Sequence, residues 1–572
     1  MALSRKIQKE ISELLRKVDL LRNEKIEDTF EAPPEPKFGD LASNLCFSLS
    51  KKLKKSPKQI AEEIAKKIKI PKSSFIKKIE ANAGYINFFF NYSKIAKFSL
   101  KEILKEKNSY GSSETGKKKR VMVEFAHPNT HKGFHIGHLR NICIGESVSR
   151  ILEFTEHKVF RTNYQGDIGP HVAKCLWGFI NLHKSKSPKK NRGDWLGQVY
   201  AEAARKFNED EKVKQEVMEI NKKLYERDKE YLKLWKMTRK WSLDYFDDIY
   251  KELGTKFDKL YFEAGVEKRA IEISKELLKK GIAKLSEGAI IIDLSKYDLG
   301  IYVLLTKEGN PLYESKDLAL AEQQFGDFKI DRCIHVVGAE QKFYFQQLFK
   351  VFELIGSPGA GKSDHLVYEL VTLKKGKMSS RLGSIILYSQ LRDEVLKKTL
   401  KEIEKRNPKT SKKEKIELAK KIGFGALKYG MLRMSGDKLL VFDMGEALQL
   451  EGNTGPYLQY AHTRCDGILK KAKRWKEKFE NENSSKEEKK IIKKLIEFPD
   501  VVEQALRDFR PHYICNYAYE LANIFSEFYH ACPVLKAETQ KLRDFRLTLV
   551  KATKTTLKNS LNLLGIETPK KM

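Results

Sequence analysis

Two histidines with helical spacing are the first residues of this sequence whose types and positions suggest chemistry. His135 and His138 lie three residues apart in the segment Val121–Asn141, where a helix is expected to follow a strand-like run. This spacing puts both imidazoles on one helical face, and the helix N-terminus adds free amides and a partial positive charge. Gly137 lets a flat ring approach the backbone. The segment therefore predicts a site for a nucleotide, although such histidine pairs also occur in metal sites and on surface helices.

A basic loop about 240 positions later is the second candidate. It reads KKGKMSSRLG over Lys374–Gly383 and follows the last strand-like run. A cationic loop of this kind can neutralise charge that develops on transferred phosphates. Taken alone, the same pattern also fits an exposed lysine-rich turn.

A third segment, Gly356–Ser363, matches the P-loop pattern GxxxxGK[ST] residue for residue. A P-loop joins a buried strand to a helix whose N-terminal amides hold phosphate. Here the order is reversed, because Phe343–Ile355 has helical spacing and His365–Leu373 is strand-like. We therefore do not assign phosphate binding to this loop.

The elements that must position these residues fall into three parts. Residues 1–26 predict an amphipathic helix, 41–68 a second helical stretch and Tyr85–Phe90 a strand, which together indicate a small α+β module. A polar linker at 108–119 ends this module.

In the middle part, strand-like runs alternate with helices, which predicts a parallel, doubly wound sheet. A charged helical stretch at 195–250 interrupts the alternation as an insertion, and from about residue 390 the pattern is almost entirely helical. The strand-like runs lie at 121–125, 158–163, 289–294, 301–306, 332–337 and 366–373.

Composition narrows the class of protein. A chain of 572 residues allows three or four domains, and 41% hydrophobic residues exclude a wholly disordered chain. The net charge of +33 favours a polyanionic partner, nucleic acid first, unless it reflects only a lysine-rich proteome. The seven cysteines contain no C-x-x-C pair, which argues against a zinc ribbon and a disulfide framework. With no signal-peptide pattern and no apolar run near ~18 residues, we expect a soluble, cytoplasmic protein with no membrane partner.

The two signatures together carry a family resemblance. His135-Ile-Gly-His138 and Lys377-Met-Ser-Ser380 resemble the HIGH and KMSKS signatures of class I aminoacyl-tRNA synthetases, and the finer match is to the arginyl-tRNA synthetase family. Two N-terminal segments, Phe38-Gly-Asp and Ala83–Phe88, resemble that family's extra domain. The other matching motifs occur in order at Glu124–His138, Asn163–Gly169, Pro311–Asp317, Gly338–Gln341, Gly452–Arg464 and Leu564–Met572.

The resemblance implies the fold, the domains and the reaction. It implies a Rossmann-like α/β class I catalytic domain, an α+β N-terminal domain and an all-α C-terminal anticodon-binding bundle. The corresponding ranges are 1–115 for the D-loop-binding domain, 116–385 for the catalytic domain with a helical insertion at about 190–255, 386–450 for a stem-contact region and 451–572 for the DALR-type anticodon domain. The implied enzyme is an arginine–tRNA ligase, a monomer that uses L-arginine, ATP with Mg²⁺ and tRNA(Arg). No tightly bound cofactor and no protein metal site are implied.

Several residues match the family's ATP-binding and catalytic positions. The resemblance assigns ATP binding to His135, Gly137, His138, Lys377, Ser379 and Arg381. It assigns catalysis to His135, His138, Lys132 and Lys377. The sequence departs from KMSKS, because Ser380 replaces the second lysine. In the family a lysine upstream of HIGH substitutes for it, and Lys132 has that position; Arg381 is the alternative, although a guanidinium is not a simple replacement for an ammonium.

A second set matches the family's arginine-contacting positions. A guanidinium is a planar fork of donors that prefers a bidentate carboxylate, which here is Asp317. Glu124 is expected to hold the substrate α-ammonium, and Tyr313 and Gln341 offer acceptor oxygens. Without the resemblance, both carboxylates would be ordinary hydrogen-bonded polar groups. The full set is Glu124, Asn129, His135, Tyr313, Asp317 and Gln341.

The resemblance also implies tRNA contacts at Tyr85, Asn87, Tyr529 and Met572. An aromatic face and an amide at Tyr85 and Asn87 suit an unpaired base. Tyr529 shares a helical stripe with other aromatic residues, so packing in the core is the alternative. Pro569 is expected to end the last helix and turn the tail that finishes at Met572 outward.

Other classes of protein remain to be weighed. A cysteinyl-type enzyme would need a zinc site, and the scattered cysteines argue against it. A glutamyl-type enzyme would need cations where Glu124 and Asp317 stand. A non-catalytic RNA-binding descendant is disfavoured because His135, His138 and Lys377 are intact. No editing-type insertion is visible, in keeping with a substrate that hydrogen bonding alone can select.

Overall fold

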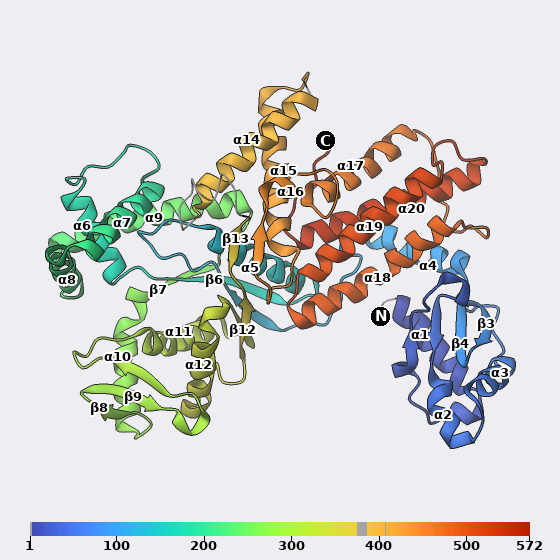
Figure 1. Ribbon diagram of the computed structural model, residues 1–572, viewed down its shortest axis with the longest axis horizontal. Coiled ribbons are helices and arrows are strands. Elements are labelled where there is room, and N and C mark those ends of the chain that lie inside the picture. The colour runs from blue at the N-terminus through green and yellow to red at the C-terminus, as the bar shows by residue number, and fades with distance from the viewer. Residues whose placement is uncertain (1–2, 375–385, 407) are drawn as a thin grey trace.

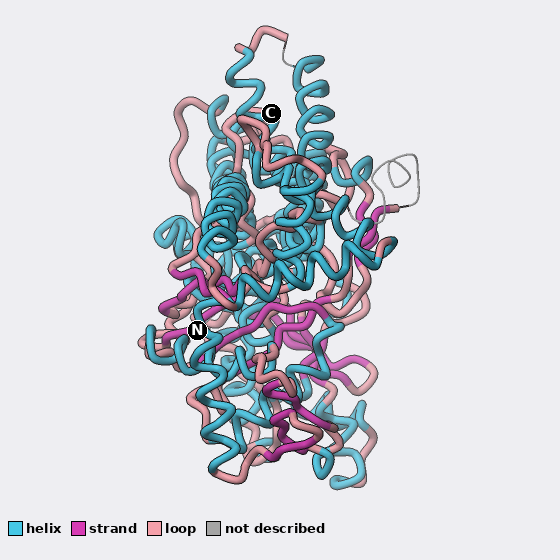
Figure 2. Tube along the Cα trace, turned by 90° about the vertical axis from the view of Figure 1, so that its left-hand side faces the viewer, coloured by secondary structure: helices cyan, strands magenta, loops and turns pink. Residues whose placement is uncertain are grey.

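The computed structural model describes residues 3–374, 386–406 and 408–572, and its elements form a central body with lobes around it (Figure 1). Strands occupy the middle and lower part of the molecule, whereas its upper part is almost entirely helical (Figure 2). Among the described helices, none is both long and apolar enough to span a membrane.

The N-terminal part is an α+β module around a four-stranded antiparallel sheet of order β1-β2-β4-β3. Its strands are β1 (Phe30–Glu31), β2 (Leu41–Ser43), β3 (Ile76–Asn82) and β4 (Tyr85–Phe90). Its helices are α1 (Leu3–Arg16), α2 (Leu45–Leu53), α3 (Pro57–Lys67) and α4 (Tyr92–Glu106).

Two of the helices expected here are shorter than predicted. The helix expected over 1–26 ends at Arg16, and the single helix expected over 41–68 is wrong. Leu41 pairs with Phe88 as part of a strand instead. Lys54 has a left-handed φ of 51° that ends α2, and Ser56 begins α3 with a capping box.

The central part, which the family resemblance expects to be catalytic, is built on a parallel five-stranded sheet of order β12-β11-β5-β6-β7, in which β5 is central. This arrangement confirms the predicted parallel sheet. Its strands are β5 (Arg120–Glu124), β6 (Lys158–Gln165), β7 (Lys259–Phe262), β11 (Arg332–Gly338) and β12 (Ser363–Tyr368). The helices α5 (Ile136–Phe154) and α12 (Lys342–Ile355) follow β5 and β11.

Four helices are inserted between β6 and β7, as the charged stretch at 195–250 predicts. They form the lobe at the upper left of Figure 1. They are α6 (Pro170–Asn181), α7 (Arg192–Glu209), α8 (Glu211–Tyr225) and α9 (Lys229–Leu253).

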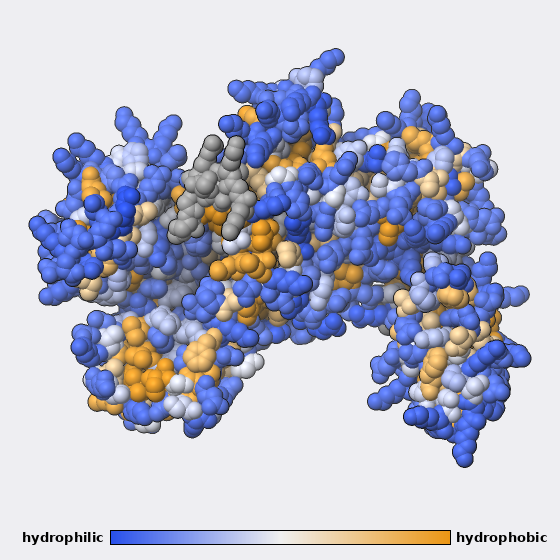
Figure 3. Space-filling view, in the orientation of Figure 1, coloured by the Kyte–Doolittle hydropathy of each residue, from blue (hydrophilic) through white to orange (hydrophobic). Residues whose placement is uncertain are grey.

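A second lobe contains strands that the sequence pattern assigned to the parallel sheet, and that assignment is wrong. The runs at 289–294 and 301–306 are joined by six residues, too few for the crossover that parallel strands need. They pair antiparallel in a separate sheet, with Tyr302 and Leu304 buried and Ile301 exposed, and apolar side chains gather on this lobe in Figure 3. The lobe comprises α10 (Glu263–Lys279), β8 (Lys284–Ser286), β9 (Ala289–Asp293), β10 (Ile301–Leu305) and α11 (Tyr313–Phe328).

The P-loop-like segment connects the end of α12 to the start of β12. This confirms the helix–loop–strand order, so the amides of 356–363 do not lie at the N-terminus of a helix. The loop cannot act as a P-loop.

The C-terminal part is helical except for β13 (Val371–Leu373) and β14 (Leu440–Phe442), which pair in parallel. Its helices pack against the central part and, at α4 and α1, against the N-terminal module (Figure 1). They are α14 (Tyr388–Arg406), α15 (Lys412–Leu432), α16 (Met444–Ala447), α17 (Gly455–Lys471), α18 (Lys486–Asp508), α19 (His512–Ala531) and α20 (Gln540–Leu563).

The predicted outward turn of the C-terminal tail is wrong. Gly565 adopts a φ of +67° just after α20, which reverses the chain and leads it back over the helices. Pro569 is buried, and its carbonyl accepts a hydrogen bond of 3.2 Å from the hydroxyl of Thr463. Met572 packs against Ile403 and Ile422, between α14 and α15.

Helix α5 is buried along most of its length, and Gly145 shows how closely it packs. A Cβ at Gly145 would overlap the ring of Phe125. In contrast, a Cβ at Gly467, inside α17, would meet nothing within 4 Å. The two glycines are therefore a matched pair, in which only one position lacks space for a side chain.

We expect Gly145→Ala to destabilise the protein by about 1–3 kcal/mol, because overpacking outweighs the gain in helix propensity. Gly467→Ala should instead raise stability by up to about 1 kcal/mol. Thermal unfolding of both variants checks this. A higher melting temperature for Gly145→Ala than for the unsubstituted protein would contradict the packing described.

Candidate active site

The loop between β5 and α5 is strained and is held from three sides. Three non-glycine residues in it have positive φ: Ala126 (82°), His127 (50°) and His131 (66°). Such conformations persist only where the surroundings over-determine them, and they cluster at functional sites. The amides of these three residues donate, in order, to side-chain oxygens of Asn141 in α5, Asn163 in β6 and Ser242 in α9. The loop that leads into the histidine pair is therefore fixed in advance.

His135 and His138 meet at the N-terminus of α5, as their spacing predicts. Their rings are stacked, with centroids 3.7 Å apart. The Nδ1 of His135 accepts a hydrogen bond from the amide of Gly137 (3.1 Å), and the Nδ1 of His138 accepts one from the amide of His135 (3.2 Å). These bonds assign the ring proton of each neutral histidine to Nε2.

Both histidines are neutral near pH 7. Burial and nearby Lys132 lower the pKa of His135 to about 4, and burial together with His135 lowers the pKa of His138 well below its usual value. The pair therefore presents two neutral N–H donors at the positive end of the dipole of α5. This combination suits the phosphates of a nucleotide.

Lys132 lies just before the histidine pair and faces α7. Its ammonium is 5.3 Å from the ring centroid of Tyr200, and the side chain is half-buried. Burial and the charge of Lys174 lower the pKa of Lys132. Lys132 thus provides positive charge on this side of the site for an incoming anion.

Asp317 lies one helical turn after Tyr313 in α11. Tyr344 of α12 donates a hydrogen bond of 2.5 Å to Oδ2 of Asp317, and its ring centroid is 4.8 Å from that of Tyr313. Burial raises the pKa of Asp317 to about 7 against the effect of that hydrogen bond, and nearby Glu124 adds to the rise. Tyr313 is 54% exposed, so this wall of the site is open.

Glu124 ends β5 and already has partners. It accepts hydrogen bonds from Gln324 and, at 3.1 Å, from Nδ1 of His335. Burial opposes the charge of Glu124, but protonated His335 lowers its pKa to about 2, and the pKa of His335 is raised well above its usual value. Oε1 of Glu124 is therefore engaged in a buried ion pair and Oε2 in a hydrogen bond with Gln324, so the carboxylate that we expected to hold the substrate α-ammonium already has two partners in the protein.

Asn129 is brought together with a residue that the sequence interpretation missed, Glu263. A Cβ on Gly166 would overlap Oδ1 of Asn129 and lie 3.2 Å from Oε1 of Glu263, so both groups lie over that glycine. Glu263 begins α10 directly after β7 and forms an ion pair of 3.3 Å with buried Lys316. The signal that was available is its position at the carboxyl end of a strand. His335 was also missed, although a histidine inside a buried strand was a comparable signal.

The predicted residues that are described gather at the carboxyl ends of the parallel strands. Gln341 is exposed in a short 3₁₀ turn, Ala339–Gln341, that follows β11. Glu124 ends β5, and the start of α5 follows the same strand. Open α/β sheets bind ligands at this edge. Lys377, Ser379 and Arg381 lie outside the described residues.

The strand that precedes the second signature is held by α5. Arg140 is 0% exposed and donates hydrogen bonds to the carbonyls of Glu369 (2.5 Å), Leu370 (2.9 Å) and Lys438 (3.1 Å). These residues flank β13 and β14. The buried side chain of Arg140 therefore connects the helix of the first signature to the strand that precedes the second signature.

The residues predicted to contact tRNA lie far from this site. Tyr85 and Asn87 share one face of β4, and Asn87 lines a cavity of about 470 Å³ together with Phe38. The ring of Tyr85 packs against Phe47, with centroids 5.0 Å apart, and does not line that cavity.

The second predicted pair is in the C-terminal helices. Tyr529 is 37% exposed at the edge of its aromatic stripe, with the guanidinium of Arg464 4.6 Å from its ring centroid, whereas Phe525 and Phe528 are buried. Met572 lines a cavity of about 630 Å³ between α14, α15 and α17. Tyr529 is therefore not a fully buried core residue.

Three family models match the chain in order. The arginyl-tRNA synthetase N-terminal domain matches residues 3–90, the catalytic domain of class I tRNA synthetases (R) matches 99–443, and the DALR anticodon-binding domain matches 458–572. Together they confirm the predicted fold class.

Relatives of known function match over nearly the whole chain. The arginine–tRNA ligase of Bdellovibrio bacteriovorus is 34% identical and covers 94% of this chain and 93% of its own; that of Pyrococcus furiosus is 36% identical over 95% of both. The arginyl-tRNA synthetase structure of Thermus thermophilus is 25% identical with a TM-score of 0.80, covering 99% of this chain and 100% of its own. The chain therefore belongs to the arginyl-tRNA synthetase family, whose class I enzymes use ATP to attach arginine to tRNA(Arg).

Proposed function

We propose that the acidic cluster at the carboxyl edge of the sheet binds the guanidinium of arginine, with Asp317 as its main carboxylate. The observation that carries this proposal is a half-buried carboxyl group with a pKa of about 7, beside Glu124 and Glu263 and without a cation of its own in the contacts described. A planar cation with five donors supplies the missing charge and hydrogen bonds. Tyr313 and Gln341 border the open side, and Asn129 with Glu124 lies toward the α-ammonium.

In this proposal ATP lies over the N-terminus of α5. Neutral His135 and His138 donate through Nε2, and the helix dipole favours the phosphates. The arginine carboxylate attacks the α-phosphate, which gives arginyl-adenylate and pyrophosphate, and the terminal adenosine of tRNA(Arg) then takes the arginyl group and releases AMP. Orientation and fixed charges lower the barrier, and no side chain forms a covalent intermediate. Mg²⁺ accompanies ATP by shielding its phosphates.

Cations around the phosphates come from two segments. Lys132 is supplied by the strained loop, and Lys377, Ser379 and Arg381 belong to the second signature by sequence. Because Ser380 replaces a lysine, we assign to Lys132 the role of the missing ammonium, which is to stabilise negative charge on the phosphates. Its position beside His135 supports this assignment.

The remaining assignments concern tRNA and domain limits. We keep 1–115 as the D-loop-binding domain, with Tyr85 and Asn87 in contact and Phe38 as an added aromatic face in the same cavity. Residues 116–385 form the catalytic domain, 386–450 the stem-contact region and 451–572 the anticodon domain, with contacts at Tyr529 and Met572.

We further propose that the enzyme acts as a monomer in the cytoplasm. All seven cysteines are buried and free, as in a reducing compartment.

We expect ATP–pyrophosphate exchange to be specific for arginine among the twenty amino acids and, as in the family, to require tRNA. Asp317 explains the specificity, because an amino acid without a side-chain cation leaves this carboxylate without a positive partner. The assay is run with each amino acid, with and without total tRNA. Equal exchange with a second amino acid would contradict the assignment of the pocket.

We expect the affinity for arginine to depend on pH through Asp317. With a pKa near 7 before arginine binds, the carboxyl is protonated below pH 7, so the KM for arginine should rise as pH falls below 7, by up to about tenfold per unit, and level off above pH 8. Asp317→Asn should weaken the binding of arginine by roughly 1.5–3 kcal/mol, which raises its KM, and should remove the dependence of this KM on pH. Exchange kinetics from pH 5.5 to 8.5 measure both.

Asp327→Asn is the matched control, because Asp327 lies on the same helix in a surface ion pair with Lys259. It should leave the KM for arginine unchanged. A pH-independent KM in the unsubstituted enzyme, or an unchanged KM in Asp317→Asn, would remove Asp317 from the guanidinium site.

We expect Lys132→Ala to lower kcat more than it raises the KM for ATP, because the ammonium acts on charge that grows in the transition state. A loss on the order of 10–100-fold corresponds to one charge-assisted contact. Lys174→Ala is the matched control: its cation neighbours Lys132 but lies 3.8 Å from the ring centroid of Phe207. Unchanged turnover in Lys132→Ala would leave Lys377 and Arg381 as the cations of the site.

A further inference from the structure

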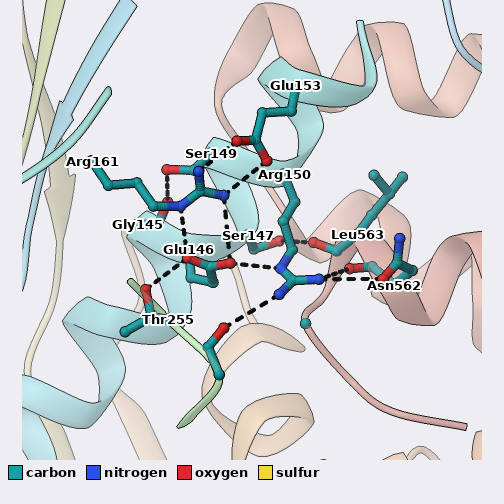
Figure 4. A network of polar contacts seen from close by, with 12 residues as sticks. Gly145, Glu146, Ser147, Ser149, Arg150, Glu153, Arg161, Thr255, Asn562 and Leu563 are labelled. Carbon is teal, nitrogen blue, oxygen red and sulfur yellow. Dashed lines mark hydrogen bonds and ion pairs between the residues drawn. The ribbon is translucent and has the colours of Figure 1, made fainter. Parts of the chain in front are cut away.

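The end of the C-terminal helix α20 is held by side chains of the catalytic part. Ser147 of α5 donates to the carbonyl of Leu563 at 2.8 Å, and Arg150 of α5 donates to the carbonyl of Asn562 at 3.2 Å (Figure 4). Lys428 of α15 donates to the carbonyl of Gly565 at 2.6 Å. The last carbonyls of a helix have no partner within it, so these donors complete the hydrogen bonding of α20. We call this contact the α5–α20 joint.

Arg150 connects three elements at the joint. Its Nε donates to Glu146 one turn earlier in α5 (2.7 Å), and its second terminal nitrogen donates to the carbonyl of Gly254 after α9 (3.4 Å). Glu146 is buried and also accepts from Thr255 (2.7 Å) and Arg161 (2.9 Å), as Figure 4 shows. A rigid planar guanidinium therefore fixes α5, the end of α20 and the segment that leads into β7.

The joint and the histidine pair are at opposite ends of the same rigid helix. Arg150 and His135 are 15 positions apart, or about 22 Å along the axis. Helix α5 is buried on nearly every face, so it moves as a unit and cannot bend freely. A displacement of the end of α20 is thus transmitted to the site where we place ATP.

We propose that Arg150 is a positioning residue that couples the C-terminal domain to the catalytic histidines. The inference rests on the proposed role of that domain in holding the anticodon. When the correct anticodon settles α20, the joint holds α5 where His135 and His138 meet the phosphates. When the anticodon is wrong, α20 and α5 are less well aligned, and turnover falls although tRNA still binds.

The test is a double-mutant cycle in which one substitution is made in the enzyme and one in its tRNA. Aminoacylation kcat and tRNA Kd are measured for the unsubstituted enzyme and Arg150→Ala, each with tRNA(Arg) and with an anticodon-substituted tRNA(Arg). We expect the unsubstituted enzyme to lose kcat by about 5–150-fold with the substituted anticodon, the usual range of coupling between sites. In Arg150→Ala, kcat with tRNA(Arg) should already be low, the anticodon effect on kcat should fall to about twofold or less, and the Kd should stay the same.

Matched variants separate coupling from folding. Asn559→Ala removes donors of α20 that reach the carbonyls of Lys107 and Tyr110 in the N-terminal module, so it should keep the full anticodon effect on kcat. Arg150→Lys retains the charge but not the three-way fork, and it should resemble Arg150→Ala. If Arg150→Ala proves unstable in thermal unfolding, Ser147→Ala takes its place. This variant removes one of the three donors to the end of α20 and should give a smaller loss of kcat and of the anticodon effect.

The outcomes distinguish this inference from the function beneath it. A full anticodon effect on kcat in a folded Arg150→Ala enzyme would overturn the coupling and leave anticodon binding intact. An anticodon effect on Kd alone in the unsubstituted enzyme would do the same. No anticodon effect on either quantity would overturn the anticodon role of the C-terminal domain as well.

Discussion

The burial of α5 is the constraint on which the rest of the structure depends. A helix enclosed on nearly all sides must satisfy every polar side chain inside the protein, because an unpaired buried polar group is costly. Asn141 therefore binds the backbone of Ala126 and of Val336 in β11, and Arg140 binds the backbone around β13 and β14. Arg150 binds the end of α20. The need of these side chains for hydrogen-bond partners thus fixes the active-site loop, the segment before the second signature and the contact with the C-terminal domain.

The site for the amino acid has the opposite charge to the protein that surrounds it. The chain carries a net charge of +33, which suits a polyanion such as tRNA. Asp317, Glu124 and Glu263 nevertheless converge at the sheet edge, where burial keeps water away and raises the pKa of Asp317. Net charge therefore describes the nucleic-acid partner, whereas the local field selects the cationic amino acid.

Periodicity predicted those parts of the fold and site that depend on neighbours in sequence. Local patterns predict the strand–helix order around His135 and His138 and the helical insertion at 195–250. They also predict the helix–loop–strand order of the P-loop-like segment. Contacts across long separations did not follow. Glu124 and His335 are 211 residues apart, so their ion pair follows from the pairing of β5 with β11 and from no local signal. The direction of the tail was predicted wrongly because Gly565, directly after α20, turns the chain back, whereas Pro569 lies beyond the end of that helix.

The strained loop gives the replacement of a signature lysine a physical basis. A cation stabilises a transition state best when its position is fixed before the substrate arrives, because no reorganisation is then needed. Lys132 follows directly after His131, whose amide is bonded to Ser242 and whose ring lies between Thr130 and Thr238. Burial lowers the pKa of His131 to about 3, so this histidine is neutral and adds no charge of its own. A lysine on such a loop has its backbone position set by α9 and β6, whatever the position of residues 375–385. The loss of a lysine at Ser380 is therefore tolerable in this chain if Lys132 acts on the phosphates from the opposite signature.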